Sequence, residues 1–362
     1  MLLAVLLTVA GTVAATSTAA NAASLPGFVL SSTTATLPPE LTALATGKRV
    51  QYVTTNINGG LITATGLIIT PKNNKKNKTV AWAHGTTGLA DQCAPSNNLP
   101  VFWQEAREAI AELLDRGWTV AAPDYPGLGT PQAHPYLVGA SEGRSIIDSV
   151  KAARNLDAAL TTQYVVDGHS QGGQGALFAS QLAPAYDGNL VLRGTSSLAP
   201  LSNADFLAPL IPGTPGQGYL VMALYGLQAV DPTFNPNAVL AGPARSRTAV
   251  LQSGCLFEIL AAYESLTASQ LVVGGVVPPS VTNRLRVYAN PGQTSPSAPV
   301  LIVHGTEDEA VPFFLSDEML VPQLEEDYNQ PVTFVPIEGA NHDGAVFESI
   351  ELVADWIADR FA

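Results

Sequence analysis

The sequence predicts an α/β protein in which a mostly parallel central sheet is flanked by helices and interrupted by one long insertion. Three observations lead to this prediction. Short apolar, β-branched segments alternate with amphipathic helical segments along most of the chain. One of these segments runs into a glycine-rich turn that opens a helix. After residue 199 the alternation stops, and it resumes only near residue 299.

The composition fits a full hydrophobic core and a sparsely charged surface. The chain has 362 residues, of which 46% are hydrophobic and 13% are charged, and its formal net charge is −13. This length suits one α/β domain with an insertion, or two domains. An acidic surface argues against nucleic acid and anionic membranes as partners. We therefore expect a secreted protein that acts on neutral substrates.

The N-terminus predicts export. Residues 2–9 are almost wholly apolar, and small residues continue to Ala20-Asn21-Ala22, which resembles a cleavage site. The basic segment that usually precedes such a run is missing, so a lipid-anchored or membrane-bound N-terminus is the alternative. Because the run is too short to span a bilayer, we interpret residues 1–22 as a signal peptide. No other stretch predicts a membrane span, and we expect no stable membrane insertion.

The remaining elements follow in order. Residues 24–39 are rich in Ser, Thr and Pro and predict an extended arm. Residues 49–56 and 61–70 predict a hairpin around an Asn-Gly-Gly turn. The alternation then predicts strands at residues 79–83, 118–122, 164–167, 189–198, 299–303 and 332–337, and helices at residues 101–116, 141–160, 175–183 and 344–361, with one more helix between the last two strands.

Residues 200–294 form the insertion. They are rich in Pro and Gly, apolar in patches, and far longer than an ordinary loop. We interpret them as a mostly helical cap or lid inserted after the sixth core strand, which leaves residues 23–199 and 295–362 as the two parts of the core. An irregular excursion without a lid role is the alternative, because periodicity does not reveal motion.

The turn Gly168-His169-Ser170-Gln171-Gly172 matches the nucleophile-elbow pattern G-x-S-x-G. Small residues two before and two after the serine allow strand and helix to approach closely, and the turn lifts the hydroxyl clear of the sheet. The backbone N–H of Gln171, at the helix N-terminus, is then expected to donate to a developing oxyanion.

A second G-x-S-x-G match surrounds Ser141. The segment before it is short and close to a proline, so it is a poor candidate for a buried strand. We interpret Ser141 as the N-cap of the helix that follows, and not as the nucleophile.

The general base is expected at His342, which lies between the last strand and the final helix. This position gives the chain order Ser, acid, His. His84 and His304 each end a buried strand and suggest structural roles, while His134 lies in a Pro-rich loop. His169 is next to Ser170, so its ring cannot turn back onto that hydroxyl. A surface role is the alternative for a lone histidine in a loop.

The acid is expected after the penultimate strand, where Glu307, Asp308 and Glu309 are adjacent. Its task is to hold the base in one tautomer and to stabilise the imidazolium. The second oxyanion donor is expected in the loop after the third strand, and we favour the backbone N–H of Thr86, with Thr87 second.

Cys93 and Cys255 are the two cysteines of the chain. In an exported protein such a pair most simply forms one disulfide, which here joins the loop after the third strand to the insertion. Two buried free thiols are the alternative. The sequence contains no Cys/His cluster that suggests a metal, and we expect neither a metal nor a cofactor.

Taken together, these residues resemble the α/β-hydrolase superfamily over about residues 45–361. The spacing H-G-x-x-D-x-x-V-P that begins at His304 recurs there, and it implies that Asp308 is the acid of the triad, a loop-capping role being the alternative. Several loops more narrowly resemble the secretory lipase family that includes relatives of Candida-type lipase A; they are residues 83–88, 93–96, 124–129 and 134–139. The resemblance implies an exported carboxylic-ester hydrolase with a cap after the sixth core strand.

The predicted function is therefore that of a secreted serine esterase or lipase. Ser170, His342 and Asp308 form the expected triad, and an acyl-enzyme is hydrolysed without a cofactor. The expected partner is a small-molecule or lipid ester, and the oligomeric state stays open. A polyester or plant-wall ester hydrolase and a serine peptidase on the same fold are alternatives. A non-catalytic binding protein would be expected to have lost a triad member, and none is missing.

Overall fold

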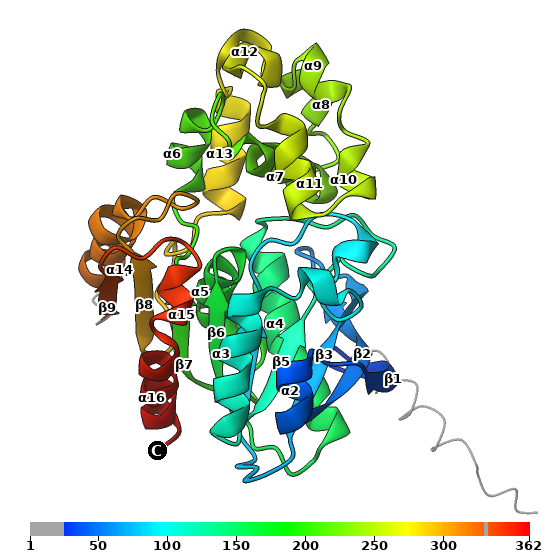
Figure 1. Ribbon diagram of the computed structural model, residues 1–362, viewed down its shortest axis with the longest axis vertical. Helices are drawn as coiled ribbons and strands as arrows, with labels where there is room; N and C mark the ends of the chain where they lie inside the picture. The colour runs from blue at the N-terminus through cyan, green and yellow to red at the C-terminus, as the bar shows by residue number, and fades with distance from the viewer. Residues whose placement is uncertain (1–24, 329–331) are drawn as a thin grey trace, which may run out of the picture.

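The computed structural model describes residues 25–328 and 332–362, shown in Figure 1. The expected signal peptide, residues 1–22, lies outside the described residues. The strands of the described chain form one sheet in the order β1-β2-β3-β5-β4-β6-β7-β8-β9. They are β1 (Val29–Ala35), β2 (Ala45–Thr55), β3 (Leu61–Pro71), β4 (Thr79–Ala83), β5 (Thr119–Pro123), β6 (Gln163–His169), β7 (Val191–Leu198), β8 (Val300–Gly305) and β9 (Val332–Ile337).

Two kinds of strand pairing divide the sheet. β1, β2, β3 and β5 pair antiparallel with one another in that order. From β5 onward, through β4, β6, β7 and β8 to β9, every pairing is parallel. A parallel pair needs a long crossover connection, which explains the helices between these strands. The mostly parallel sheet that the sequence predicts is confirmed.

The N-terminal edge differs from the prediction. Residues 24–39, expected to be an extended arm, contain β1, which pairs with β2 from Val29 opposite Tyr52 to Ala35 opposite Gly47. The β1 side chains are largely exposed. Because β1 buries neither face, its Ser/Thr-rich sequence lacks the alternation of apolar and polar residues that indicates a strand. The insertion follows the sixth strand when the count begins at β2, and the seventh when β1 is included.

Helices cover both faces of the sheet (Figure 1). Apolar side chains of α2, α3, α15 and α16 are buried against one face, and those of α4 and α5 against the other. β4 and β8 are buried along their whole length, which explains their mostly apolar sequences. The helices of the core are α2 (Pro39–Leu44), α3 (Gln104–Asp115), α4 (Gly139–Leu156), α5 (Gln171–Tyr186), α14 (Val321–Tyr328), α15 (Gly344–Phe347) and α16 (Ile350–Phe361).

The segment between β7 and β8 folds into short helices that lie over one end of the sheet (Figure 1). They bury an apolar cluster of their own, which also takes in Tyr136 and Leu137 from the core. In the described part of the chain, no helix has the length and apolar character needed to cross a membrane. The helices of this segment are α6 (Ala204–Leu207), α7 (Gln217–Val230), α8 (Pro236–Val239), α9 (Gly242–Arg245), α10 (Val250–Ser253), α11 (Leu256–Tyr263), α12 (Ala268–Leu271) and α13 (Pro279–Tyr288).

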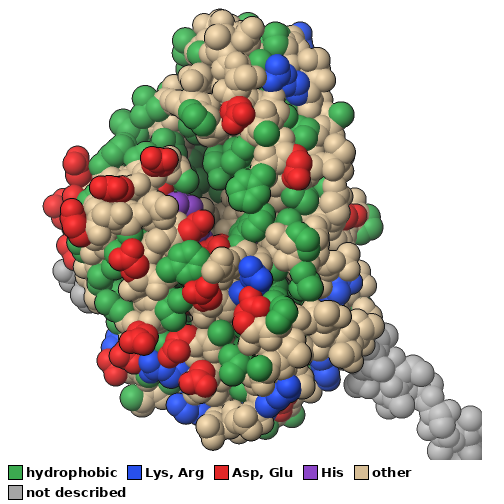
Figure 2. Space-filling view, in the orientation of Figure 1, with side chains coloured by type: hydrophobic (Ala, Val, Ile, Leu, Met, Phe, Trp, Pro, Cys, Tyr) green, Lys and Arg blue, Asp and Glu red, His purple; other side chains and the backbone are tan. Residues whose placement is uncertain are grey.

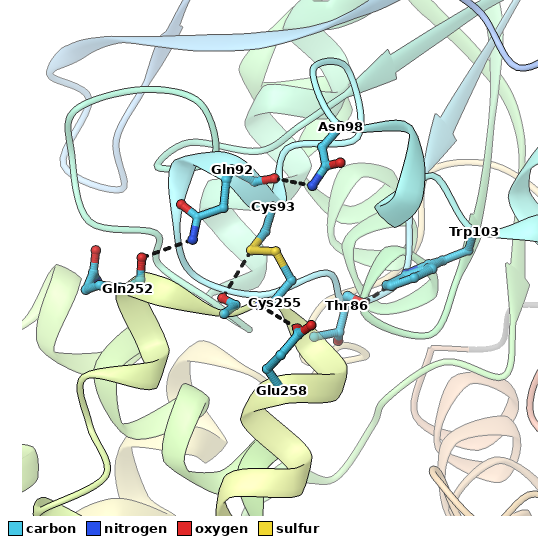
Figure 3. The surroundings of a disulfide bond; sticks show 9 residues. Thr86, Gln92, Cys93, Asn98, Trp103, Gln252, Cys255 and Glu258 are labelled. Carbon is cyan, nitrogen blue, oxygen red and sulfur yellow. Dashed lines mark hydrogen bonds between the residues drawn. A yellow bond between two sulfur atoms is a disulfide. The ribbon is translucent and has the colours of Figure 1, made fainter.

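A disulfide between Cys93 and Cys255 joins this helical segment to the core (Figure 3). It ties the loop after β4 to the N-terminus of α11. Next to it, the Leu256 N–H donates to Thr87 O at 2.8 Å. Gln92 Nε2 donates to the main-chain oxygen of Gln252 at 3.0 Å, as Figure 3 shows. The expected disulfide is present, and it lies next to the loop that carries Thr86.

Replacing both cysteines by serine is expected to lower the free energy of unfolding by about 4–5 kcal/mol. The bond closes a loop of 162 residues, and such a crosslink reduces the conformational entropy of the unfolded chain. Urea unfolding of wild type and the Cys93→Ser, Cys255→Ser variant measures the difference. Dithiothreitol should destabilise the wild type and leave the variant unchanged. Equal midpoints for both proteins would contradict the prediction.

Candidate active site

Ser170 occupies a strained turn between β6 and α5. Its φ and ψ are 58° and −117°, a conformation that residues other than glycine seldom adopt. A Cβ on Gly168 would lie 2.3 Å from Gly172 O, and a Cβ on Gly172 would lie 1.9 Å from Ala83 O. Only glycine fits at these two positions, so the spacing of the motif follows from the close approach of α5 to β4 and β6.

Asp308 and His342 are hydrogen-bonded beyond the carboxyl ends of β8 and β9. His342 Nδ1 lies 2.6 Å from Asp308 Oδ2. The backbone N–H groups of Ala310 and Val311 both donate to Asp308 Oδ1 at 2.8 Å. Because a carboxylate only accepts hydrogen bonds, Nδ1 of His342 carries the hydrogen, and Nε2 of the neutral ring is left to accept a proton.

His304 is a second partner of the same carboxylate. Its Nε2 lies 3.1 Å from Asp308 Oδ2 and 2.9 Å from Val311 O, so Nε2 carries the ring hydrogen, and Nδ1 accepts from Ser316 Oγ at 2.8 Å. Burial raises the pKa of Asp308, but hydrogen bonds from His304 and His342 outweigh burial and hold that pKa well below its usual value. Asp308 is therefore a fixed anion in contact with two imidazoles.

His169 connects the turn of Ser170 to the loop of His342. Its Nε2 donates to His342 O at 3.2 Å, and the centroids of the two rings are 4.6 Å apart. His342 therefore lies beside the turn that carries Ser170. Within the described residues, no hydrogen bond joins Ser170 Oγ to His342. Such contacts often tighten only when substrate binds.

Thr86 and Gln171, the residues expected to supply oxyanion donors, line the same cavity as Ser170. A Cβ on Gly85 would lie 3.5 Å from Ser170 Cβ, so the loop after β4 runs against Ser170. Thr86 is held from two sides. Its Oγ1 is 2.8 Å from the Tyr136 hydroxyl, and its main-chain oxygen accepts from Trp103 Nε1 at 3.1 Å.

A cavity of about 530 Å³ lies between the core and the helices of the insertion. Figure 2 shows a hollow between these two parts, with hydrophobic side chains around it. The polar residues of the cavity include Thr86, Ser170 and Gln171. Its apolar lining includes Leu201, Ala204, Leu207, Ala208, Leu210, Ile211, Tyr219, Leu220, Ala223, Leu260 and Leu285. Such a lining suits a hydrocarbon chain.

Ring nitrogens of His169 and His342 and a carboxylate oxygen of Asp343 lie within 4.8 Å of one another. These three residues are the group in the described chain that most resembles a metal site. His169 Nε2 already donates to His342 O, however, and His342 Nδ1 donates to Asp308. The ring nitrogens left for a metal ion would be Nδ1 of His169 and Nε2 of His342, and the second of these is the atom expected to take the proton of Ser170.

Glu105, at the start of α3, is a buried carboxyl that the sequence did not single out. Its Oε1 lies 3.9 Å from His169 Nδ1. Burial, followed by repulsion from Asp343, raises the pKa of Glu105 to about 8. The hydrophobic periodicity of residues 101–116 predicts a helix that contains Glu105. It does not indicate that the carboxyl of Glu105 is buried.

The Glu105→Gln variant is expected to resist alkaline pH better than the wild type. The native carboxyl keeps its proton between pH 4.5 and about 8, where the unfolded one loses it, so the wild type becomes less stable as pH rises through this window. The full change corresponds to roughly 4–5 kcal/mol. Thermal unfolding of both proteins from pH 5 to 8.5 measures the difference. A stability difference between the two proteins that stays constant with pH, or that grows toward acid pH, would contradict this prediction.

Ser141, in the second G-x-S-x-G match, is not an N-cap as predicted. α4 begins two residues earlier, at Gly139, with Val138 in the capping position. Ser141 is buried, and its Oγ has no hydrogen-bond partner among the described residues. Its neighbour Glu142 is buried as well, and its Oε1 accepts from Gln171 Nε2 at 2.7 Å. No sequence pattern indicates that contact.

Comparison with known proteins agrees with this architecture. The family model described as secretory lipase matches residues 95–362. The secreted triacylglycerol lipase LIP7 of Malassezia globosa is 27% identical over 343 residues, which cover 86% of this chain and 70% of that protein. Across eight Malassezia and Candida lipases that it matches, the chain spans 57–70% of their length.

Two solved structures share the fold. Candida antarctica lipase A in its closed state has a TM-score of 0.78 at 20% identity, over 93% of this chain and 82% of that chain. The rice cell wall degrading esterase LipA from Xanthomonas oryzae has a TM-score of 0.75 at 19% identity, over 93% and 99%. The predicted resemblance is confirmed. The chain belongs to the secretory lipase family of α/β-hydrolases, and it is a secreted ester hydrolase.

Proposed function

We propose that this chain hydrolyses esters of apolar carboxylic acids through Ser170, His342 and Asp308. One observation carries the proposal. A serine in a strained turn faces an apolar cavity, beside an imidazole that is hydrogen-bonded to a buried carboxylate. That combination supplies a nucleophile, a base in a fixed tautomer and a site for an acyl chain.

In the proposed reaction, Ser170 Oγ attacks the ester carbonyl carbon while His342 Nε2 takes the hydroxyl proton. The backbone N–H groups of Thr86 and Gln171 donate to the oxyanion of the tetrahedral intermediate. His342 then gives its proton to the departing alcohol, which leaves the acyl group on Ser170. Water, deprotonated by His342, cleaves this acyl-enzyme and releases the acid. Asp308 orients His342 and stabilises the imidazolium throughout.

Residues 200–294 act in this proposal as a cap that shapes the acyl site. The cavity takes most of its apolar lining from this segment, which includes side chains of α6, α7, α11 and α13. Burying one methylene group contributes about 0.8 kcal/mol, which corresponds to roughly a fourfold gain in kcat/KM. A plant-wall ester is the second candidate, suggested by the Xanthomonas esterase, and the mostly apolar lining of the cavity favours an apolar acyl chain over it.

Initial rates on p-nitrophenyl esters from acetate to palmitate test the proposal. We expect kcat/KM to rise by roughly fourfold per methylene until the cavity is full, and then to level off. The acyl chain length at which it levels off separates an esterase from a lipase. A flat profile would contradict the apolar acyl site. A failure to hydrolyse any of these esters would remove the proposed function and favour peptide substrates.

A further inference from the structure

The second G-x-S-x-G motif, which the reaction does not use, supplies a carboxyl buried beside the nucleophile's turn. Glu142 lies in the first turn of α4, and its side chain is fully buried. Its Oε2 has no hydrogen-bond partner among the described residues. Burying a carboxyl in this way is costly unless it is compensated. We propose that Glu142 is a positioning residue that holds the donors of the oxyanion hole through Gln171 and Leu137, an inference that rests on the proposed function.

The first contact of Glu142 fixes the side chain of Gln171. Gln171 Nε2 lies 2.7 Å from Glu142 Oε1 and 3.3 Å from His134 Nε2. His134 Nδ1 donates to Pro126 O at 2.7 Å, which leaves Nε2 as an acceptor. The two amide hydrogens of Gln171 therefore have one acceptor each. Because Gln171 is the first residue of α5, fixing its side chain also restrains its backbone N–H.

The second contact of Glu142 leads to Thr86, the residue expected to supply the other oxyanion donor. The Leu137 N–H donates to Glu142 Oε1 at 3.1 Å. Leu137 has a φ of 60°, so this hydrogen bond stabilises a loop conformation that is otherwise unfavourable. The adjacent Tyr136 hydroxyl lies 2.8 Å from Thr86 Oγ1. One carboxyl oxygen is therefore connected to both residues expected to supply the oxyanion N–H groups.

The protonation state of Glu142 suggests the variants to use. Burial raises the pKa of this carboxyl to about 8, against the opposing hydrogen bonds from Gln171 and from the Leu137 backbone. At neutral pH the side chain is therefore uncharged. Glu142→Gln keeps an acceptor at Oε1 and places an amide where the second oxygen lies. Glu142→Leu has a similar volume but offers no acceptor.

Steady-state kinetics on a p-nitrophenyl ester, with active sites counted by titration, test the inference. We expect Glu142→Leu to lower kcat by roughly 10- to 100-fold and to leave KM within about twofold of wild type. Misplaced donors weaken hydrogen bonds to the oxyanion of the transition state more than those to the bound substrate. Glu142→Gln should keep kcat within about threefold of wild type. Loss of stability alone would reduce the number of active sites without changing kcat per site.

Inhibition by an alkylboronic acid gives an independent measurement, because its bond to Ser170 Oγ creates a tetrahedral anion. The inhibition constant should rise in Glu142→Leu by about the factor that kcat falls. If Glu142→Leu fails to fold, Gln171→Met removes the same hydrogen bond from its donor side and should give the same pattern.

The outcomes separate this inference from the proposed function. Wild-type kcat and boronate affinity in Glu142→Leu, with Ser170→Ala inactive, would overturn the role of Glu142 alone. Equal losses in the Gln and Leu variants would also overturn it, because the acceptor would not matter. An active Ser170→Ala variant would instead remove the proposed function.

Discussion

Ser170→Ala is expected to lower kcat by roughly 10⁵- to 10⁶-fold, the largest effect that any single substitution should have here. Alanine has no oxygen to attack the carbonyl, so no acyl-enzyme forms. Residual hydrolysis over water should come only from the oxyanion donors and substrate binding. The measurement is the initial rate on the best p-nitrophenyl ester, with KM determined in parallel and expected to change little.

Ser141→Ala is the matched control, because both serines lie at the centre of a G-x-S-x-G sequence. Ser141 is buried and its Oγ has no partner in the described chain, so this variant should keep activity within about twofold. Diethyl p-nitrophenyl phosphate should label the peptide that contains Ser170 and leave Ser141 unmodified. Activity that follows Ser141 and not Ser170 would reverse the assignment.

Asp308→Asn should reduce kcat by about 10⁴-fold. The Asn oxygen is expected to replace Oδ1, where it accepts the two backbone N–H groups of residues 310 and 311. Its NH₂ group then replaces Oδ2 and faces donors on His304 and His342. To avoid this clash, His342 must move its hydrogen from Nδ1 to Nε2, and a protonated Nε2 cannot accept the proton of Ser170.

Glu307→Gln provides the control for Asp308→Asn, because it removes an exposed carboxylate from the same loop. Its kcat should stay within about twofold of wild type. Measuring both variants from pH 6 to 9 distinguishes a loss of the correct tautomer from a simple shift of the pH profile. Recovery of wild-type rates by Asp308→Asn at high pH would argue against the tautomer explanation.

The parallel sheet and the order of the expected catalytic residues could be predicted because each leaves a local signal. Gly168 and Gly172 are required by the tight turn around Ser170 and its close approach to β4, and they leave a recognisable five-residue motif. Asp308 and His342 follow β8 and β9, whose sequences are mostly apolar. β1 could not be predicted in the same way, because an exposed edge strand is stabilised by its pairing with β2 and buries little side-chain area.

Buried polar contacts could not be predicted, because burial is a property of the packed molecule. Glu105 and Glu142 look like surface residues of amphipathic helices, yet both are turned inward toward the nucleophile's turn. The prediction that Ser141 is an N-cap is wrong for the same reason, since the start of α4 at Gly139 depends on contacts with its surroundings. The helices between β7 and β8 also depend on a shared apolar cluster, and their periodicity is weak.

The insertion between β7 and β8 also has a consequence for biosynthesis. Ser170 precedes this segment, whereas Asp308 and His342 follow it, and the parallel pairing of β7 with β8 spans the whole insertion. A nascent chain that ends within the insertion has the proposed nucleophile but neither the proposed base nor the proposed acid. Contacts across such a long separation also form late in folding. Hydrolysis through the proposed triad therefore has to await synthesis of the C-terminal strands.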